Sequence, residues 1–113
     1  LDPACTAILS SRLLTEANGF SHPKLGPGRL DFSGLSHDSR RDTLWIASDQ
    51  GQCLFHYDWT GDQVLQRLDL MLNDGGKSKR VRKAEGVAVD SERGRVYVVS
   101  DRDAELYVFK LHG

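Results

Sequence analysis

Three carboxylates have the residue type and the position that suit metal chemistry, namely Glu85, Asp49 and Asp101. Calcium is a hard cation that takes oxygen ligands, many of them from carboxylates. Glu85 opens one predicted strand, and Asp49 and Asp101 stand in equivalent turns after two others. They form a calcium site only if those turns face one end of the fold. The alternatives are a solvated or salt-bridged Glu85, and Asp49 and Asp101 that cap their Ser-Asp turns.

A basic run is the second chemical feature, with five charges in seven residues: Lys77, Lys79, Arg80, Arg82 and Lys83. Such a run suits phosphate or an acidic partner. No aromatic residue interleaves to stack bases, so a solvated loop is the alternative and nucleic acid is not an expected partner. Residues 75–78 lack the first glycine of a phosphate loop, because Met71 stands in its place.

Histidine and cysteine predict no further site. The four histidines have no metal-ligand spacing, and Cys5 and Cys53 form no CxxC pair. A Cys5–Cys53 disulfide is one interpretation, and a small apolar strand residue at Cys53 is the other. No Ser-His-Asp arrangement is recognisable, so no catalytic residue is predicted.

The elements that position these residues come from a sequence that repeats itself. Residues 32–61 and 84–113 align without a gap at an offset of 52 residues, and eight of the thirty pairs are identical. Ordinary composition gives roughly two identities. A repeat near fifty residues is typical of arrays in which one unit cannot bury its own apolar face and stacks on its neighbours.

Each copy predicts three strands separated by polar turns. The strands are residues 34–37, 43–47 and 54–57 in the first copy, and 86–89, 95–99 and 106–109 in the second. A fourth strand at 64–70 follows only the first copy. Because 43–47 and 95–99 are apolar without clear alternation, we expect both to be buried on both faces.

Four short antiparallel strands describe a β-propeller blade, so the fold class is all-β with about two blades. We assign 31–73 to a blade, 74–83 to a basic interblade loop and 84–113 to an incomplete final blade. Closed propellers have roughly four to eight blades. The expected partners are therefore other blades of the same full-length protein, or other copies in a homo-oligomer.

Residues 1–30 fit the repeat poorly. One interpretation is a short helix that begins at Asp2-Pro3, ends at Asn18-Gly19 and buries its leucines and isoleucine: Ile8, Leu9, Leu13 and Leu14. The other is a strand at 6–9, which belongs to a preceding blade or supplies a missing outer strand. Residues 22–28 form a Pro/Gly loop on either interpretation.

Bulk properties exclude several classes. A formal net charge of -1 gives no overall field to attract nucleic acid or an acidic membrane surface. No run approaches the about eighteen apolar residues of a membrane-spanning helix, and no signal peptide is recognisable. Because the chain starts at Leu1, we expect a processed or excised piece.

The phrases at 31–38 and 84–90, the second leading to 96–100 and 106–109, resemble the bacterial SdiA-regulated family. That family is a β-propeller whose last two blades carry an SGL phrase and then an AEG phrase. More remotely, phytase-like and gluconolactonase-like propellers use related blade openings. The resemblance covers about residues 30–113 and implies the C-terminal part of a cell-envelope, periplasmic propeller with calcium in its channel. Where the family has a glutamate after the second strand of the last blade, this chain has Asp101.

Three functions follow as hypotheses. The leading one is a non-catalytic module that binds calcium or a small ligand near Glu85. The second is a calcium-dependent hydrolase of the phytase-like phosphoesterase or lactonase kind, which requires several convergent carboxylates and a general base. The third is a protein-interaction scaffold that uses a ring face and the basic loop.

Overall fold

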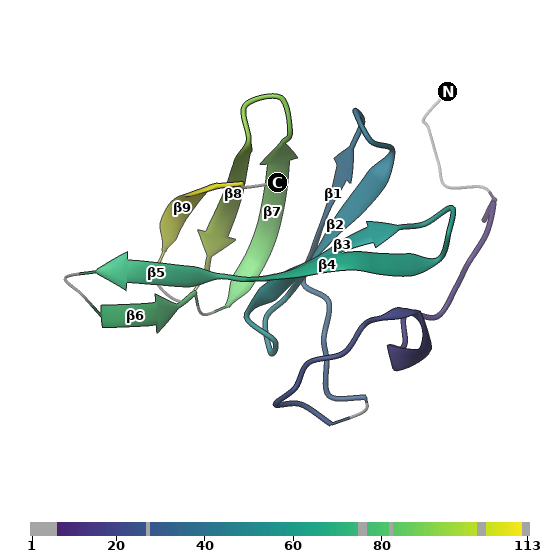
Figure 1. Ribbon diagram of the computed structural model, residues 1–113, viewed down its shortest axis with the longest axis horizontal. Helices are drawn as coiled ribbons and strands as arrows, with labels where there is room; N and C mark the ends of the chain where they lie inside the picture. The colour runs from purple at the N-terminus through teal and green to yellow at the C-terminus, as the bar shows by residue number, and fades with distance from the viewer. Residues whose placement is uncertain (1–6, 27, 75–76, 82, 102–103, 112–113) are drawn as a thin grey trace.

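The computed structural model describes residues 7–26, 28–74, 77–81, 83–101 and 104–111. Within them the chain forms nine β-strands and one short 3₁₀ helix, η1 (Glu16–Asn18). The strands build a four-stranded sheet, then a two-stranded hairpin, then a three-stranded sheet (Figure 1). Every pairing is antiparallel.

The first sheet is a meander in which each strand pairs with its neighbour in the chain. Its strands are β1 (Gly34–Asp38), β2 (Thr43–Ser48), β3 (Cys53–Asp58) and β4 (Gln63–Asp69). Tight turns with a left-handed residue connect them, at Asp42, Gln52 and Asp62. The strands predicted at 34–37, 43–47, 54–57 and 64–70 are all present.

The second sheet repeats the first three strands as β7 (Ala84–Asp90), β8 (Arg95–Ser100) and β9 (Glu105–Lys110). Its inner strand β7 packs beside β1 of the first sheet (Figure 1). The predicted all-β class with two propeller-like blades is therefore confirmed. We call β1–β4 the first blade and β7–β9 the second blade.

The main core lies between the two blades. Trp45, Ala47 and Leu54 of the first blade are buried in one cluster with Val96 and Val98 of the second. A smaller cluster covers the opposite face of the first blade, where Phe20 packs on residues of β2 and β3: Ile46, Cys53, Phe55 and Tyr57. The first blade is thus covered on both faces.

The stretch between the two blades, where the sequence predicts a basic loop, contains paired strands. A hairpin of β5 (Met71–Asp74) and β6 (Lys77–Arg80) occupies most of it. Its base is anchored because the Val81 N–H donates to the Leu70 carbonyl at 3.0 Å and both side chains are buried in the main core. The basic residues 77–80 therefore form a strand through backbone pairing, which their polar sequence did not indicate.

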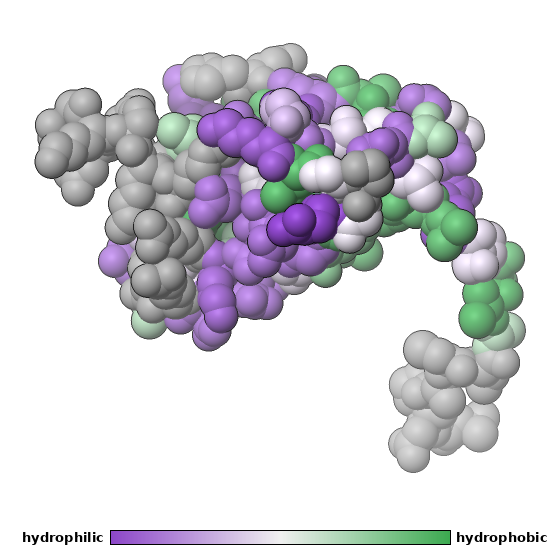
Figure 2. Space-filling view, turned by 90° about the horizontal axis from the view of Figure 1, so that it is seen from below, coloured by the Kyte–Doolittle hydropathy of each residue, from purple (hydrophilic) through white to green (hydrophobic). Residues whose placement is uncertain are grey.

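Over residues 7–26 the N-terminal segment is neither of the two expected elements, and the predicted helix start at Asp2-Pro3 lies outside the described residues. Residues 7–14 have no regular secondary structure, and only Glu16–Asn18 form a helical turn. Ile8, Leu9 and Leu13 are 85%, 98% and 84% exposed, so the predicted burial of these side chains is wrong. The predicted end at Asn18-Gly19 is right, since Gly19 has a left-handed φ of 100°. In Figure 2 the tail that leads to the N-terminus projects from the body with apolar residues along it.

Candidate functional site

The three predicted carboxylates lie at the same end of the two blades. The pairs Gly34↔Ala47 and Ala84↔Ser100 put the start of each inner strand beside the end of the next strand. Glu85 and Asp101 are exposed and Asp49 is half-buried. In the part of the chain that the structure describes, no group of three His, Cys, Asp or Glu residues is placed to hold a metal ion. These acidic residues share an edge of the two blades, and a calcium site among them stays a prediction.

The turn after β2 is capped by residues other than Asp49. Asp31 Oδ1 accepts hydrogen bonds from the Gln50 N–H at 2.7 Å and from the Ser48 hydroxyl at 3.1 Å. The Ser48 hydroxyl oxygen in turn accepts the Gly51 N–H at 3.0 Å. Asp49 contributes its backbone carbonyl, which accepts the Gln52 N–H at 3.1 Å.

The remaining sequence candidates lie on different parts of the chain. Lys77, Lys79 and Arg80 lie on β6, Lys83 is exposed just before β7, and Arg82 lies outside the described residues. Cys53 is fully buried on β3, and Cys5 falls outside the described residues, so the proposed disulfide stays untested.

Among the described residues, three side-chain hydrogen bonds join the two blades along β1 and β7, and we call them the seam bonds. The Ser33 hydroxyl donates to the Ala84 carbonyl. The Ser36 hydroxyl oxygen accepts the Val89 N–H at 3.1 Å. Asp38 Oδ1 accepts the Ser91 hydroxyl at 3.0 Å. These bonds fix one blade against the other in a single register.

Asp38 is the most heavily bonded residue of the seam. It also accepts the N–H groups of Arg40 and Arg41, and its Oδ2 lies 3.4 Å from the indole nitrogen of Trp45. Burial acts to raise the pKa of Asp38, but the bonds from Trp45, Arg41, Ser91 and Arg40 outweigh it and lower that pKa below its ordinary value. The buried carboxylate therefore stays ionised.

His56 is a structural residue of the same packed face. Its ring stacks on Trp45, with centroids 4.0 Å apart and planes 4° apart, and its Nε2 lies 2.7 Å from the Thr43 hydroxyl. Burial, and secondarily the charge of Arg41, lower the pKa of His56, against a smaller opposing effect of Asp38 and Asp58. His56 is therefore neutral at neutral pH.

The second blade exposes a full apolar face on the side away from the first blade. We call it the open face, and it consists of Ala88, Tyr97, Val99, Leu106 and Val108. Val99, Leu106 and Val108 are 49%, 61% and 54% exposed. The prediction that 95–99 would be buried on both faces is therefore wrong, because no described element covers this side of β8. The same prediction is right for 43–47, which lies between the core and the N-terminal segment.

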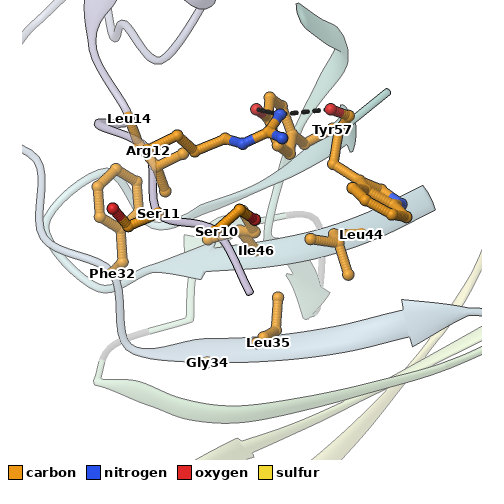
Figure 3. A pocket seen from close by; sticks show the side chains of 11 residues that line it. Ser10, Ser11, Arg12, Leu14, Phe32, Gly34, Leu35, Leu44, Ile46 and Tyr57 are labelled. Carbon is orange, nitrogen blue, oxygen red and sulfur yellow. Dashed lines mark hydrogen bonds between the residues drawn. The ribbon is translucent and has the colours of Figure 1, made fainter. Parts of the chain in front are cut away.

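The other face of the first blade is mostly covered by the N-terminal segment, but a cavity of about 510 Å³ opens beside that segment. Leu35, Leu44, Ile46 and Tyr57 line it from the strands, and Ser10, Ser11 and Arg12 cross it from the N-terminal segment (Figure 3). Leu35 at its inner end is 62% exposed. We call this surface the strap-side face, because residues 12–26, the strap, cover its outer part.

A polar network holds the strap on the blade. Asp62 Oδ1 accepts the Tyr57 hydroxyl and, at 3.0 Å, the Asn18 amide. Arg12 donates to the Tyr57 oxygen at 3.0 Å and to the carbonyl of Trp59 (Figure 3). Burial and the bond to Asp62 raise the pKa of Tyr57, so its hydroxyl stays a donor across the physiological range. Phe20 then lies against Phe55 and Tyr57, with ring centroids 5.1 Å away in each case.

The family model described as SdiA-regulated matches residues 24–110, which is most of the chain. The chain belongs to the SdiA-regulated family. The match spans both blades and the hairpin between them, so the resemblance in the repeated phrases is confirmed over this whole range. No solved structure matches this chain. None of the described helices has the length and apolar character to cross a membrane.

Sequence reasoning missed two features of this SdiA-regulated chain. It placed a polar turn after residues 34–37, where Asp38 accepts the Arg40 N–H, but it did not predict the bond from Asp38 to Ser91 of the other blade. It also gave no role to Arg12, Tyr57 and Asp62. Arg12 and Tyr57 are 45 residues apart in sequence, and Tyr57 and Asp62 are 5 residues apart. The retention of Asp38 and Ser39 as Asp90 and Ser91 in the second copy was the available signal for the seam.

Proposed function

We propose that this chain is a non-catalytic interaction module, a two-blade propeller unit that binds further β-propeller blades through its open face and its strap-side face. The observation that carries the proposal is which positions of the repeat the exposed residues occupy. Each open-face residue occupies the repeat position of a first-blade residue that packs against the second blade. The pairs are Ala88/Ser36, Tyr97/Trp45, Val99/Ala47, Leu106/Leu54 and Val108/His56.

The matching first-blade face is closed to water. Trp45, Ala47, Leu54 and His56 are at most 3% exposed. Contiguous exposed apolar patches are rare on soluble proteins and mark interaction sites. In repeat arrays the neighbouring unit covers such a face. A further blade is therefore the partner whose shape and polarity fit the open face.

Footprinting with a diffusible carbene reagent in cells that express the protein tests this function. Leu65, on the outer strand β4, is 57% exposed and serves as the matched control for Leu106 and Val108. If further blades cover the open face, Leu106 and Val108 will be labelled several-fold less than Leu65. Labelling in proportion to the exposed fractions would refute the function.

Calcium binding is a second candidate, and its support is that Glu85, Asp49 and Asp101 lie at one end of the blades. The ion needs more oxygens than this edge brings together, so other blades must supply them. Calorimetric titration with calcium chloride should give heat with the native assembly and less heat with Glu85→Gln. Equal heats would remove Glu85 from the proposal.

The hydrolase alternative and the envelope location stay predictions. Hydrolysis requires converging carboxylates, and within the described ranges the acidic residues form no such group. A location in the cell envelope rests on the family resemblance and is tested by fractionation of expressing cells.

A further inference from the structure

We propose that the blade on the open face is the first blade of a second copy of this chain, docked head-to-tail through its strap-side face. This inference rests on the proposed function and names its partner. The contact between the two blades of one chain supplies the geometry. There, the face of the first blade that corresponds to the open face packs on the face of the second blade that corresponds to the strap-side face.

The strap-side face has the composition of a surface that is already known to receive a blade. Within the chain, the second blade packs on the first through Val87, Val96, Val98, Tyr107 and Phe109. Their repeat mates in the first blade are Leu35, Leu44, Ile46, Phe55 and Tyr57. Four of these five line the cavity of about 510 Å³. An open face brought against this cavity meets the exposed Leu35 and the half-buried Leu44, whereas Ile46 and Tyr57 are already covered by the strap.

The strap and the three-stranded second blade also fit one another. Inside the chain, Leu68 of the fourth strand and Phe109 line one groove between the blades. The repeat mate of Phe109 is Tyr57, and it is Phe20 of the strap that packs there. The strap therefore stands where the fourth strand of an arriving blade would pack. The second blade has three strands over the residues that the structure describes, and none of them occupies the position that corresponds to the strap.

One seam bond has both partners in place for such a contact. Asp90 is the mate of Asp38 and Ser39 is the mate of Ser91, so Asp90 of one copy can accept the Ser39 hydroxyl of the next. Ala88 and Glu85 replace Ser36 and Ser33, so the other two side-chain bonds are not reproduced. The contact between copies is consequently weaker than the seam within the chain, and association depends on concentration.

Sedimentation velocity of the purified chain over a concentration series tests the inference. The mean mass should rise above 12.6 kDa with concentration. Leu35→Lys and Leu106→Lys each place a charge on one face at a side chain more than half exposed, so the chain still folds, as circular dichroism will verify. The association constant of each variant should be at least roughly tenfold lower than that of the native chain, because a buried unpaired charge opposes docking. Leu65→Lys, equally exposed on β4, should associate like the native chain.

Mixing the two variants gives the decisive outcome. Each retains the face that the other has lost, so an equimolar mixture should form a species of twice the chain mass although neither forms it alone. A mixture that stays monomeric, or a native chain that is monomeric at about 1 mM, overturns the second copy as partner. If the chain is monomeric while Leu106 and Val108 are protected from carbene labelling in cells, the proposed function stands and the covering blade comes from another source.

Discussion

Asp38 at the end of β1 and Ser91 in the turn after β7 are joined by a 3.0 Å hydrogen bond across the two blades. They are 53 residues apart, one more than the repeat offset, and the other seam bonds span 51 and 53 residues. The two residues of each seam bond therefore occupy nearly the same position in their own copies of the repeat, but they lie on opposite faces of the two blades. The seam is a contact between like elements displaced by one unit.

Removing the carboxylate of Asp38 should destabilise the chain far more than removing that of its mate. Asp38→Ala leaves the buried Trp45 indole and the partly buried N–H and hydroxyl donors of the seam without their acceptor, so we expect the free energy of unfolding to fall by roughly 2 to 4 kcal/mol. Asp90→Ala removes a bond to the Arg93 N–H in an exposed turn and should cost about 1 kcal/mol. Urea denaturation measures both. Equal losses would mean that Asp38 acts only as a turn cap.

The repeat glycines Gly34 and Gly86 provide a matched pair for the closeness of the seam. A Cβ on Gly34 would lie 3.3 Å from the Val87 nitrogen and 3.4 Å from the Gly86 Cα, whereas a Cβ on Gly86 would meet nothing within 4 Å. Gly34→Val should therefore lower the free energy of unfolding by about 1 to 3 kcal/mol by separating the blades. Gly86→Val should leave the stability of the monomer unchanged in thermal unfolding. A larger loss for Gly86→Val would contradict the close approach at Gly34.

Stability should fall in mild acid because of His56. Its pKa in the folded chain is lowered, so the folded state binds the proton less readily than the unfolded state does. The stabilisation is complete above the unfolded pKa of about 6.5 and is lost as the pH falls through the folded value. In His56→Val, which copies its mate Val108, this slope between pH 7.5 and pH 5 should disappear. Urea midpoints across that range measure it, and an unchanged slope would assign the effect to other groups.

The strap should loosen when Gly19 receives a side chain. Gly19 has φ of 100°, and a Cβ there would lie 2.8 Å from the Val64 Cβ. Gly28 has a φ of 75°, and a Cβ there would meet nothing within 4 Å. Gly28→Ala therefore introduces the strain of a left-handed alanine without a steric contact, and it serves as the control. We expect Gly19→Ala to speed hydrogen exchange at the Phe20 N–H, which donates to the Thr15 carbonyl at 3.0 Å, by at least about tenfold. Similar exchange in the two variants would show that the packing on Val64 is unimportant.

Much of the fold could be predicted because the blade strands are local features. β-branched and aromatic runs between polar turns mark β2, β3, β8 and β9, and repetition marks the units. The hairpin strand β6 could not be predicted, since its residues carry no apolar pattern and its pairing is through the backbone. Residues 7–14 have apolar side chains with no helix, so composition was misleading there.

The candidate site was less predictable because burial depends on what the neighbour covers. Ala47 and Val99 are repeat mates with similar apolar side chains, yet one is fully buried and the other is 49% exposed. Nothing local to either residue indicates that difference. The edge shared by Glu85, Asp49 and Asp101 followed from the antiparallel register, whereas the grouping of oxygens around an ion needs spatial information that one chain does not carry.

The spacing of the seam bonds near one repeat length also bears on how such a protein changes over evolutionary time. A unit that contacts its neighbour through two different faces brings, when its gene segment is duplicated, a donor face and an acceptor face that already match those in place. Lengthening the array by one unit then requires no newly invented surface. What limits the number of units is whether the accumulated rotation brings the last face back to the first.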